Sequence, residues 1–220
     1  MTATSRAAAS HDVGNDDLPA PLGHVTLRFV TERPLSERDG IERWSVEAFV
    51  ADGGGRDSGS LAGLNLVVVD LLRSVDPWAA LDSSNDDLAH IGDTVFDMNT
   101  GQLSEALDSR IPPSGNRLLI LDRVELQPDW RGHNVAALLV AECLDQLRTG
   151  CRVALCLPAP LERRAEESDE EYQASVERMR HVWSQVGFRP FRDGVWLLEP
   201  NSGALDESLR NLRSRHGLTA

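Results

Sequence analysis

A short run in the middle of the chain has the residue types and spacing of an anion-binding site. An apolar strand and a Pro-Asp turn precede residues 131–136, which open an amphipathic helix. The first turn of a helix carries N–H groups without intrahelical partners, and the helix dipole makes that end partly positive. Arg131 adds a formal charge, while Gly132 and Ala136 leave room for a ligand to approach the backbone. This order of residues predicts a diphosphate site.

The helix that follows must hold this run in place. Its apolar residues recur at steps of three and four, which is the pattern of a helix with one buried face. They are Ala136, Leu139, Val140, Cys143, Leu144 and Leu147. We therefore expect the helix to pack on a sheet, with its N-terminus at the solvent edge.

Residues 127–139 resemble the acyl-CoA signature of the GNAT superfamily of N-acetyltransferases, which is summarised as Arg/Gln-x-x-Gly-x-Gly/Ala. The chain reads Arg131-x-x-Asn134-x-Ala136, so Asn134 stands where the pattern has its first glycine. Asn tolerates unusual backbone angles better than most residues. Residues 182–188 resemble a second family segment, Leu-Tyr-x-x-x-Gly-Phe, with Trp183 at the tyrosine position. The alternative, a strand–turn–helix in some other α/β domain, stays open because such a loop is a weak signal by itself.

The resemblance implies an α/β fold of the α+β kind, with a mixed, mostly antiparallel, splayed central sheet of about six to seven strands flanked by helices. It implies acetyl-CoA as cosubstrate and no metal. In this family the strand before the signature splays from its neighbour at a bulge, which frees main-chain groups for the pantetheine arm. The residues expected to bind acetyl-CoA are Val124, Leu126, Arg131, Gly132, His133, Asn134, Val135, Ala136 and Ala137.

Two carboxylates in the strand before the signature are candidate general bases. Asp122 and Glu125 follow the apolar run at residues 118–121. Desolvation of a carboxylate favours its protonated form, which suits a base that works near neutral pH. Asp122 also stands where some polyamine-type members of the superfamily carry an acidic residue, so we rank it before Glu125. The open alternative is that Asp122 only forms an ion pair with Arg123 or Arg117.

The source of the proton for the leaving thiolate is less obvious. The indole of Trp183 cannot deliver a proton. Tyr172 is the only tyrosine, and it lies about three helical turns, or roughly 16 Å, before Trp183. Ser184, His181 or a water molecule could serve instead, and Ser184 is the candidate catalytic residue.

Composition excludes several classes of function. The net charge of −13 argues against a nucleic-acid partner and favours a cationic acceptor. The chain contains no lysine, which excludes a lysine nucleophile. Its three cysteines have no Cys-x-x-Cys spacing, so neither a disulfide framework nor a zinc site is indicated. Since no membrane span or secretion signal is evident, we expect a cytoplasmic protein without a membrane partner.

The chain divides into three parts by pattern. Residues 1–22 read as a disordered leader, residues 23–200 as one GNAT-like domain, and residues 201–220 as a tail with a helix near 204–215 that could serve docking or a homodimer contact. Strands are expected at 24–31, 44–51 and 61–72, with a hairpin connection at glycines 53–55, and later at 152–157, 188–191 and 195–198. An insertion at 73–116, with helices near 86–96 and 103–109, would replace the family's usual acceptor wall.

The expected activity is transfer of an acetyl group from acetyl-CoA to a primary amine of a small-molecule or peptide acceptor. The alternative is a GNAT-fold module that binds acyl-CoA or a protein partner with little or no catalysis. Trp183 and Asn134 favour this second interpretation because both depart from the family pattern.

Overall fold

The computed structural model describes residues 18–32, 40–51, 57–160 and 168–218. Most of the expected leader, residues 1–17, and the expected connection at glycines 53–55 lie outside the described residues. Leu22, at the end of the expected leader, is buried in the core and begins a short 3-10 helix, η2 (Leu22–His24). The packed part of the chain therefore includes Leu22.

Seven strands form one open sheet in the order β1-β2-β3-β4-β5-β7-β6. Neighbouring strands are antiparallel except β4 and β5, which are parallel. This confirms the expected mixed, mostly antiparallel sheet and its number of strands. The strands are β1 (Val25–Thr31), β2 (Ile41–Ala51), β3 (Asp57–Asp70), β4 (Arg117–Leu126), β5 (Cys151–Cys156), β6 (Arg189–Arg192) and β7 (Val195–Leu198).

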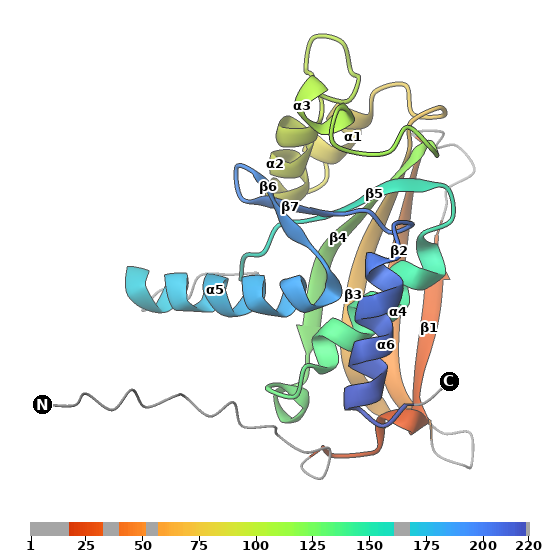
Figure 1. Cartoon of the computed structure of the whole chain (residues 1–220), viewed down its shortest axis with the longest axis vertical. Helices are drawn as coiled ribbons and strands as arrows, with labels where there is room; N and C mark the ends of the chain where they lie inside the picture. Colours follow the sequence, from red (N-terminus) through yellow and green to blue (C-terminus); the bar gives the residue numbers. More distant parts are fainter. Residues whose placement is uncertain (1–17, 33–39, 52–56, 161–167, 219–220) are drawn as a thin grey trace, which may run out of the picture.

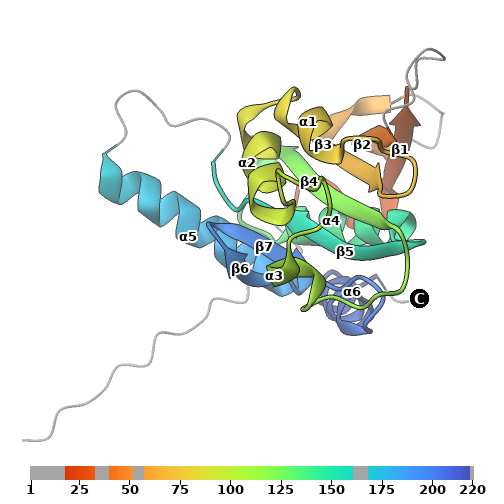
Figure 2. The same cartoon turned by 90° about the horizontal axis from the view of Figure 1, so that it is seen from above.

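Helices cover both faces of the sheet, as Figures 1 and 2 show. On one face lie α4 (Val135–Leu147) and α6 (Ala204–Arg215), and on the other lie α1 (Pro77–Asp82) and α2 (Asp86–Val95). Helix α5 (Asp169–Val186) projects away from the sheet at its N-terminal end. Its C-terminal end returns to the core, where Trp183 and Val186 are buried.

Strand β4 is buried on both faces because it runs between the two helical layers. Leu119 and Leu121 belong to the hydrophobic cluster under α4, and Leu118 and Ile120 to the cluster under α1 and α2. Successive side chains of a strand point to opposite faces, so an unbroken apolar run suits a strand in this position. Residues 122–126 thus continue β4 beyond its doubly buried part, and residues 127–136 follow the strand.

The insertion at residues 73–116 contains the two expected helices, α2 and the short α3 (Glu105–Asp108). It also contains α1, which we did not predict. The carboxylate of Asp76 accepts a hydrogen bond from the Ala79 N–H at 2.9 Å, and Pro77 takes the first helical position. This cap and proline are the usual start signals of a helix, but six residues are too few to show a period.

The expected start of α5 at a capping box is confirmed. The Ser168 hydroxyl accepts from the Glu171 N–H at 3.3 Å, and the Glu171 carboxylate accepts from the Ser168 N–H at 2.9 Å. The N–H and the hydroxyl of Ser168 both donate to the Glu171 carboxylate and hold its pKa below its usual value. The helix ends at Gly187, which adopts a φ of 107° that favours glycine.

The tail forms α6 where a helix was expected, and α6 packs against α4. Leu205, Leu209 and Leu212 are buried in the cluster that contains α4. Arg213 donates two hydrogen bonds to the Glu142 carboxylate, at 2.7 and 2.9 Å. The leucines expected to serve docking are therefore used inside the chain. Among the described residues, no helix is both long and apolar enough to cross a membrane.

Candidate functional site

A bulge in β4 and the end of its pairing with β5 open a cleft in the sheet. Leu121 pairs with Leu66 of β3, but Arg123 pairs with Asn65, so Asp122 is an extra residue without a partner on β3. The parallel ladder with β5 ends at the pair of Leu121 and Cys156, while β4 continues to Leu126. Because a strand edge presents N–H and C=O groups, the stretch 122–126 can bond to an extended ligand.

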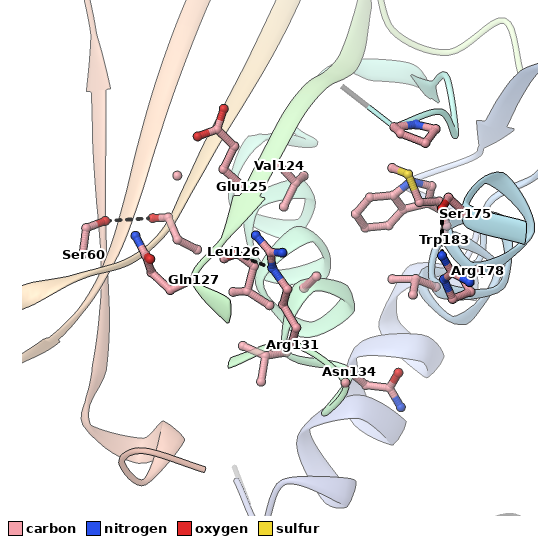
Figure 3. Close-up of a pocket in the computed structure, with 18 residues that line it drawn as sticks. Ser60, Val124, Glu125, Leu126, Gln127, Arg131, Asn134, Ser175, Arg178 and Trp183 are labelled. Atoms are coloured by element: carbon pink, nitrogen blue, oxygen red, sulfur yellow. Dashed lines mark hydrogen bonds between the residues drawn. The ribbon is translucent and has the colours of Figure 1, made fainter. Parts of the chain in front are cut away.

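The cleft has a volume of about 1040 Å³. The end of β4 and the start of α4 form one wall, and α5 forms the other (Figure 3). Its lining residues are Ser60, Ala62, Gly63, Val124, Glu125, Leu126, Gln127, Arg131, Gly132, Asn134, Val135, Ala136, Pro160, Ser175, Arg178, Met179, Val182 and Trp183. Eight of the residues that the sequence analysis selected are in this set, namely Val124, Glu125, Leu126, Arg131, Gly132, Asn134, Val135 and Ala136.

The N-terminus of α4 faces this cleft with open backbone donors. The first intrahelical bond of α4 runs from the Leu138 N–H to the Asn134 carbonyl at 3.2 Å, so the N–H groups of Val135, Ala136 and Ala137 have no intrahelical acceptor. The side chain of Asn134 does not cap the helix, whereas α1, α2 and α5 all start with a side-chain cap. The helix start therefore has the open donors that the predicted anion site requires.

Asn134 takes the backbone conformation that a glycine would favour. Its φ of 58° and ψ of 15° lie in the left-handed region, and Gly132 has a φ of 86°. Asn enters this region more easily than residues with bulkier side chains. The departure from glycine at this position therefore leaves the loop geometry possible.

Replacement of Asn134 should distinguish backbone conformation from side-chain chemistry. Asn134→Val forces a β-branched residue into the left-handed region at a cost of about 1–2 kcal/mol, which corresponds to a Tm lower by roughly 3–6 °C for a chain of this size. Asn134→Gly should stay within about 2 °C of the parent protein. Thermal unfolding measures both, and equal Tm values for the two variants would contradict a conformational role.

Two arginines face the cleft from opposite walls. Arg131 donates from Nε to the Leu126 carbonyl at 2.8 Å, which ties the loop to the end of β4. Arg178 of α5 donates to the Ser175 hydroxyl at 2.7 Å on the far wall (Figure 3). Glu125 also lines the cleft, but its carboxylate points away from Trp183 and Arg178. An anionic ligand can therefore meet a cation on each side.

The sequence analysis missed Arg178. One wall of the cleft is lined by four residues of α5 that are three, one and three positions apart, namely Ser175, Arg178, Met179 and Val182. That spacing was available in the sequence as one face of a helix. Met179 belongs to the apolar stripe of α5 that packs against the core, so nothing in the sequence marked this face of the helix as ligand-binding.

His133 and Ala137 do not line the cleft. Ala137 is fully buried in the core beneath α4. His133 interacts electrostatically with His216 at the end of α6, and its buried Nδ1 has no hydrogen-bond partner among the described residues. Burial lowers the pKa of His216, and the charges of Arg215 and His133 lower it further. The side chain of His133 therefore lies away from the cleft, and its backbone is the part of this residue that could contact a ligand.

Asp122 lies beside a second hollow, which has a volume of about 690 Å³. The hollow is lined by β2, β3 and the start of α2, including Trp44, Asn65 and Asn85. The bulge separates the two cavities, since Val124 and Leu126 pack with the α4 cluster while Asp122 lines this hollow. Asp122 thus lines the second hollow and not the cleft.

The ion pair considered for Asp122 is not seen in the structure. Arg117 pairs with Glu42 at 2.6 Å, and Arg123 pairs with Glu125 at 3.6 Å. Asp122 accepts a hydrogen bond from the Asn85 side chain at 3.1 Å. Its carboxylate is therefore bonded to a neutral amide.

A nearby carboxylate makes the region around Asp122 electronegative. Burial raises the pKa of Asp87, and the carboxylates of Asp122 and Asp86 raise it further. An ammonium group would be favoured at such a place, because it would relieve the repulsion between these carboxylates.

The structure does not bring Ser184 to the cleft. Its exposed hydroxyl donates to the His181 carbonyl at 2.7 Å. Trp183, one residue earlier, is buried and lines the cleft. Among the described residues there is also no group of three His, Cys, Asp or Glu side chains that could hold a metal ion.

Comparison of the chain with protein-family models, with curated proteins and with solved structures finds no match. Function must therefore be inferred from the residues and geometry of the chain itself.

Proposed function

We propose that the protein is an N-acetyltransferase that transfers an acetyl group from acetyl-CoA to a primary amine. The observation that carries this proposal is the bulge at Asp122, which lies where β4 leaves β5 and which separates the cleft at the open N-terminus of α4 from the second hollow that Asp122 lines. A donor and an acceptor could approach the same strand from its two sides.

The cleft suits the parts of acetyl-CoA in order. The diphosphate would accept from the N–H groups at the start of α4, with Arg131 beside them. The pantetheine arm contains two amides, so it could bond to the edge of β4 at residues 122–126 much as an added strand does. Small side chains at Gly132 and Ala136 allow the close approach that this requires.

The sheet supports the resemblance to the GNAT superfamily. In that family the strand before the signature separates from its neighbour at a bulge. Here β4 has a bulge at Asp122 and continues beyond the end of its pairing with β5. The left-handed conformation of Asn134 also supports its place at the pattern's glycine position.

We propose Asp122 as the general base. The amine nitrogen attacks the carbonyl carbon of the thioester, and the new C–N bond forms as the C–S bond breaks. The acceptor ammonium first loses a proton to the carboxylate of Asp122, which frees the lone pair for this attack. After the attack the nitrogen passes its second proton through water to the CoA thiolate that leaves. Main-chain N–H groups on the open side of residues 122–126 would stabilise the negative charge that develops on the carbonyl oxygen.

The acceptor would be a cationic amine that enters from the second hollow. Asp122, Asp87 and Asp86 concentrate negative charge beside that hollow. The insertion supplies its wall through Ser84, Asn85 and Leu88. This is the role that the sequence suggested for the insertion, and the net charge of −13 would assist the approach of a cation.

One observation favours the alternative of an acyl-CoA-binding module without efficient catalysis. Trp183 lines the cleft where the family pattern has a tyrosine, and its indole cannot donate a proton to the thiolate. Loss of that donor does not prevent transfer in principle, because a thiolate is a tolerable leaving group.

An assay of thiol release over a panel of amines tests the activity. We expect acetyl-CoA consumption to depend on the amine and the acetylated product to appear by mass spectrometry. The protein's own thiols should not disturb the assay, because burial raises the pKa of Cys143 to about 12 and of Cys151 to about 11, and raises that of Cys156 well above its usual value. Acetyl-CoA binding without acceleration by any amine would favour the binding module.

Arg178→Ala should weaken acetyl-CoA binding without affecting the fold. A charge-assisted hydrogen bond contributes about 1.5–3 kcal/mol, so the Kd should rise by roughly tenfold or more. Arg180→Ala is the matched control, because it removes the same charge from the same helix but lies at a different hollow, next to the β6–β7 hairpin. Calorimetric titration measures both, and equal Kd values for the two variants would remove Arg178 from the site.

A further inference from the structure

The turn between α1 and α2 makes two hydrogen bonds to the sheet. The Ser84 hydroxyl accepts from Arg43 of β2 at 2.9 Å, and the Asn85 Nδ2 donates to Oδ1 of Asp122 at 3.1 Å. The insertion that carries this turn lies outside the segments of the chain that resemble the GNAT superfamily. The hydrogen bond from Asn85 to Asp122 is therefore not implied by that resemblance.

The side-chain amide of Asn85 is oriented by a second bond. Its Oδ1 accepts from the Leu88 N–H at 2.8 Å and so caps α2. Because one end of the amide must accept this bond, the other end must present N–H groups to Asp122. The helix start thus fixes the direction in which Asn85 donates.

This donor leaves Asp122 with one occupied and one open carboxylate oxygen. Among the described residues only Oδ1 receives a hydrogen bond, so Oδ2 is the oxygen available to a proton from the amine.

We propose that Asn85 is a positioning residue that orients the Asp122 carboxylate toward the acceptor in the second hollow. The inference rests on the proposed function for its consequence in catalysis, but the contact between the two side chains can be tested without activity. It assigns the insertion a part in the reaction besides forming a wall.

Several charged groups share the surroundings of Asp122, and the test must allow for them. They come from α2, from β4 itself, from β2, and from the residue that follows β1. The groups are Asp86, Asp87, His90, Arg123, Glu32 and Arg43. None of them changes in the variants described next, so differences among those variants report on Asn85.

Three substitutions of Asn85 separate the cap from the donor. Asn85→Ser and Asn85→Asp keep an oxygen that can cap α2. The aspartate carboxylate has no N–H to donate, and the serine hydroxyl ends one atom short of the Nδ2 position from which Asn85 donates to Asp122. Asn85→Ser should keep the parent Tm within about 2 °C, and both variants should lose about tenfold or more in kcat. Asn85→Ala loses the cap as well, so its Tm should fall by about 2–4 °C. A purely structural role would instead preserve the kcat of the serine and aspartate variants.

The split between kcat and KM gives a second readout. If Asn85 orients the base, Asn85→Ser should lower kcat while the KM for the amine stays within about twofold of the parent value, because a misdirected carboxylate loses transition-state stabilisation and not substrate binding. A raised KM with an unchanged kcat would assign Asn85 to binding of the amine instead and would overturn the inference.

Nuclear magnetic resonance tests the contact directly. The side-chain N–H resonances of Asn85 should move in Asp122→Ala, which removes their acceptor at 3.1 Å, and should keep their positions in Glu125→Gln. Resonances that keep the parent positions in Asp122→Ala would refute the contact whatever the kinetics show. If no amine is acetylated at all, the proposed function fails, while a resonance shift that requires Asp122 would still support the contact.

Discussion

Asp122→Asn is expected to lower kcat/KM by about 10²–10⁴-fold, the range associated with loss of a general base. Asn has the same shape and keeps an oxygen that can accept the 3.1 Å hydrogen bond from Asn85. The substitution therefore removes the proton acceptor while it preserves the turn and the bulge. Steady-state kinetics with the best amine of the panel measure the loss.

Two measurements make the Asp122 result specific. The Kd for acetyl-CoA should change by less than about twofold, because Asp122 lines the second hollow and not the cleft. Glu125→Gln is the matched control, since Glu125 is exposed and pairs with Arg123 at 3.6 Å. Activity retained in Asp122→Asn, or a greater loss in Glu125→Gln, would remove Asp122 as the base.

Ala136→Glu is expected to abolish acetyl-CoA binding, with a Kd raised by more than about 100-fold. Ala136 lines the cleft in the first turn of α4, next to backbone N–H groups that have no intrahelical acceptor. A glutamate there would fill the space meant for a diphosphate and would repel it. A negative charge in the first turn of a helix is itself compatible with folding. Calorimetric titration together with thermal unfolding separates binding from stability.

Gln146→Glu provides the control for added charge. Gln146 is exposed near the other end of α4, so the same net charge is introduced away from the cleft. Its affinity for acetyl-CoA should match that of the parent protein. Equal affinities for Ala136→Glu and Gln146→Glu would show that the start of α4 does not hold the phosphates.

Much of the fold follows from local patterns in the sequence. The apolar run at residues 118–121 correctly predicted a buried strand, and Ser168 with Glu171 correctly predicted the start of a helix. These succeed because a doubly buried strand and a capping box are specified by neighbours in the chain. The ends of several strands differ from the predicted ones. Strand β2, for example, begins at Ile41 rather than near Trp44.

The arrangement of the site could be predicted only in part. The sequence selected the loop and the strand end correctly as neighbours of one cleft, since both are local to the start of α4. It could not show on which face of the sheet Asp122 lies, because that depends on the bulge opposite Asn65. Arg178 and Asn85 reach the site from distant parts of the chain, and single-sequence periodicity does not report such contacts.

The central proposal is that the cleft beside α4 holds acetyl-CoA, and isothermal titration of the parent protein with acetyl-CoA tests it most directly. One molecule should bind per chain with a Kd in the range of about 1–100 μM, and the affinity should fall as salt rises because Arg131 and Arg178 contribute charge. Absence of binding at millimolar acetyl-CoA by a folded protein would contradict both the acetyltransferase and the acyl-CoA-binding module.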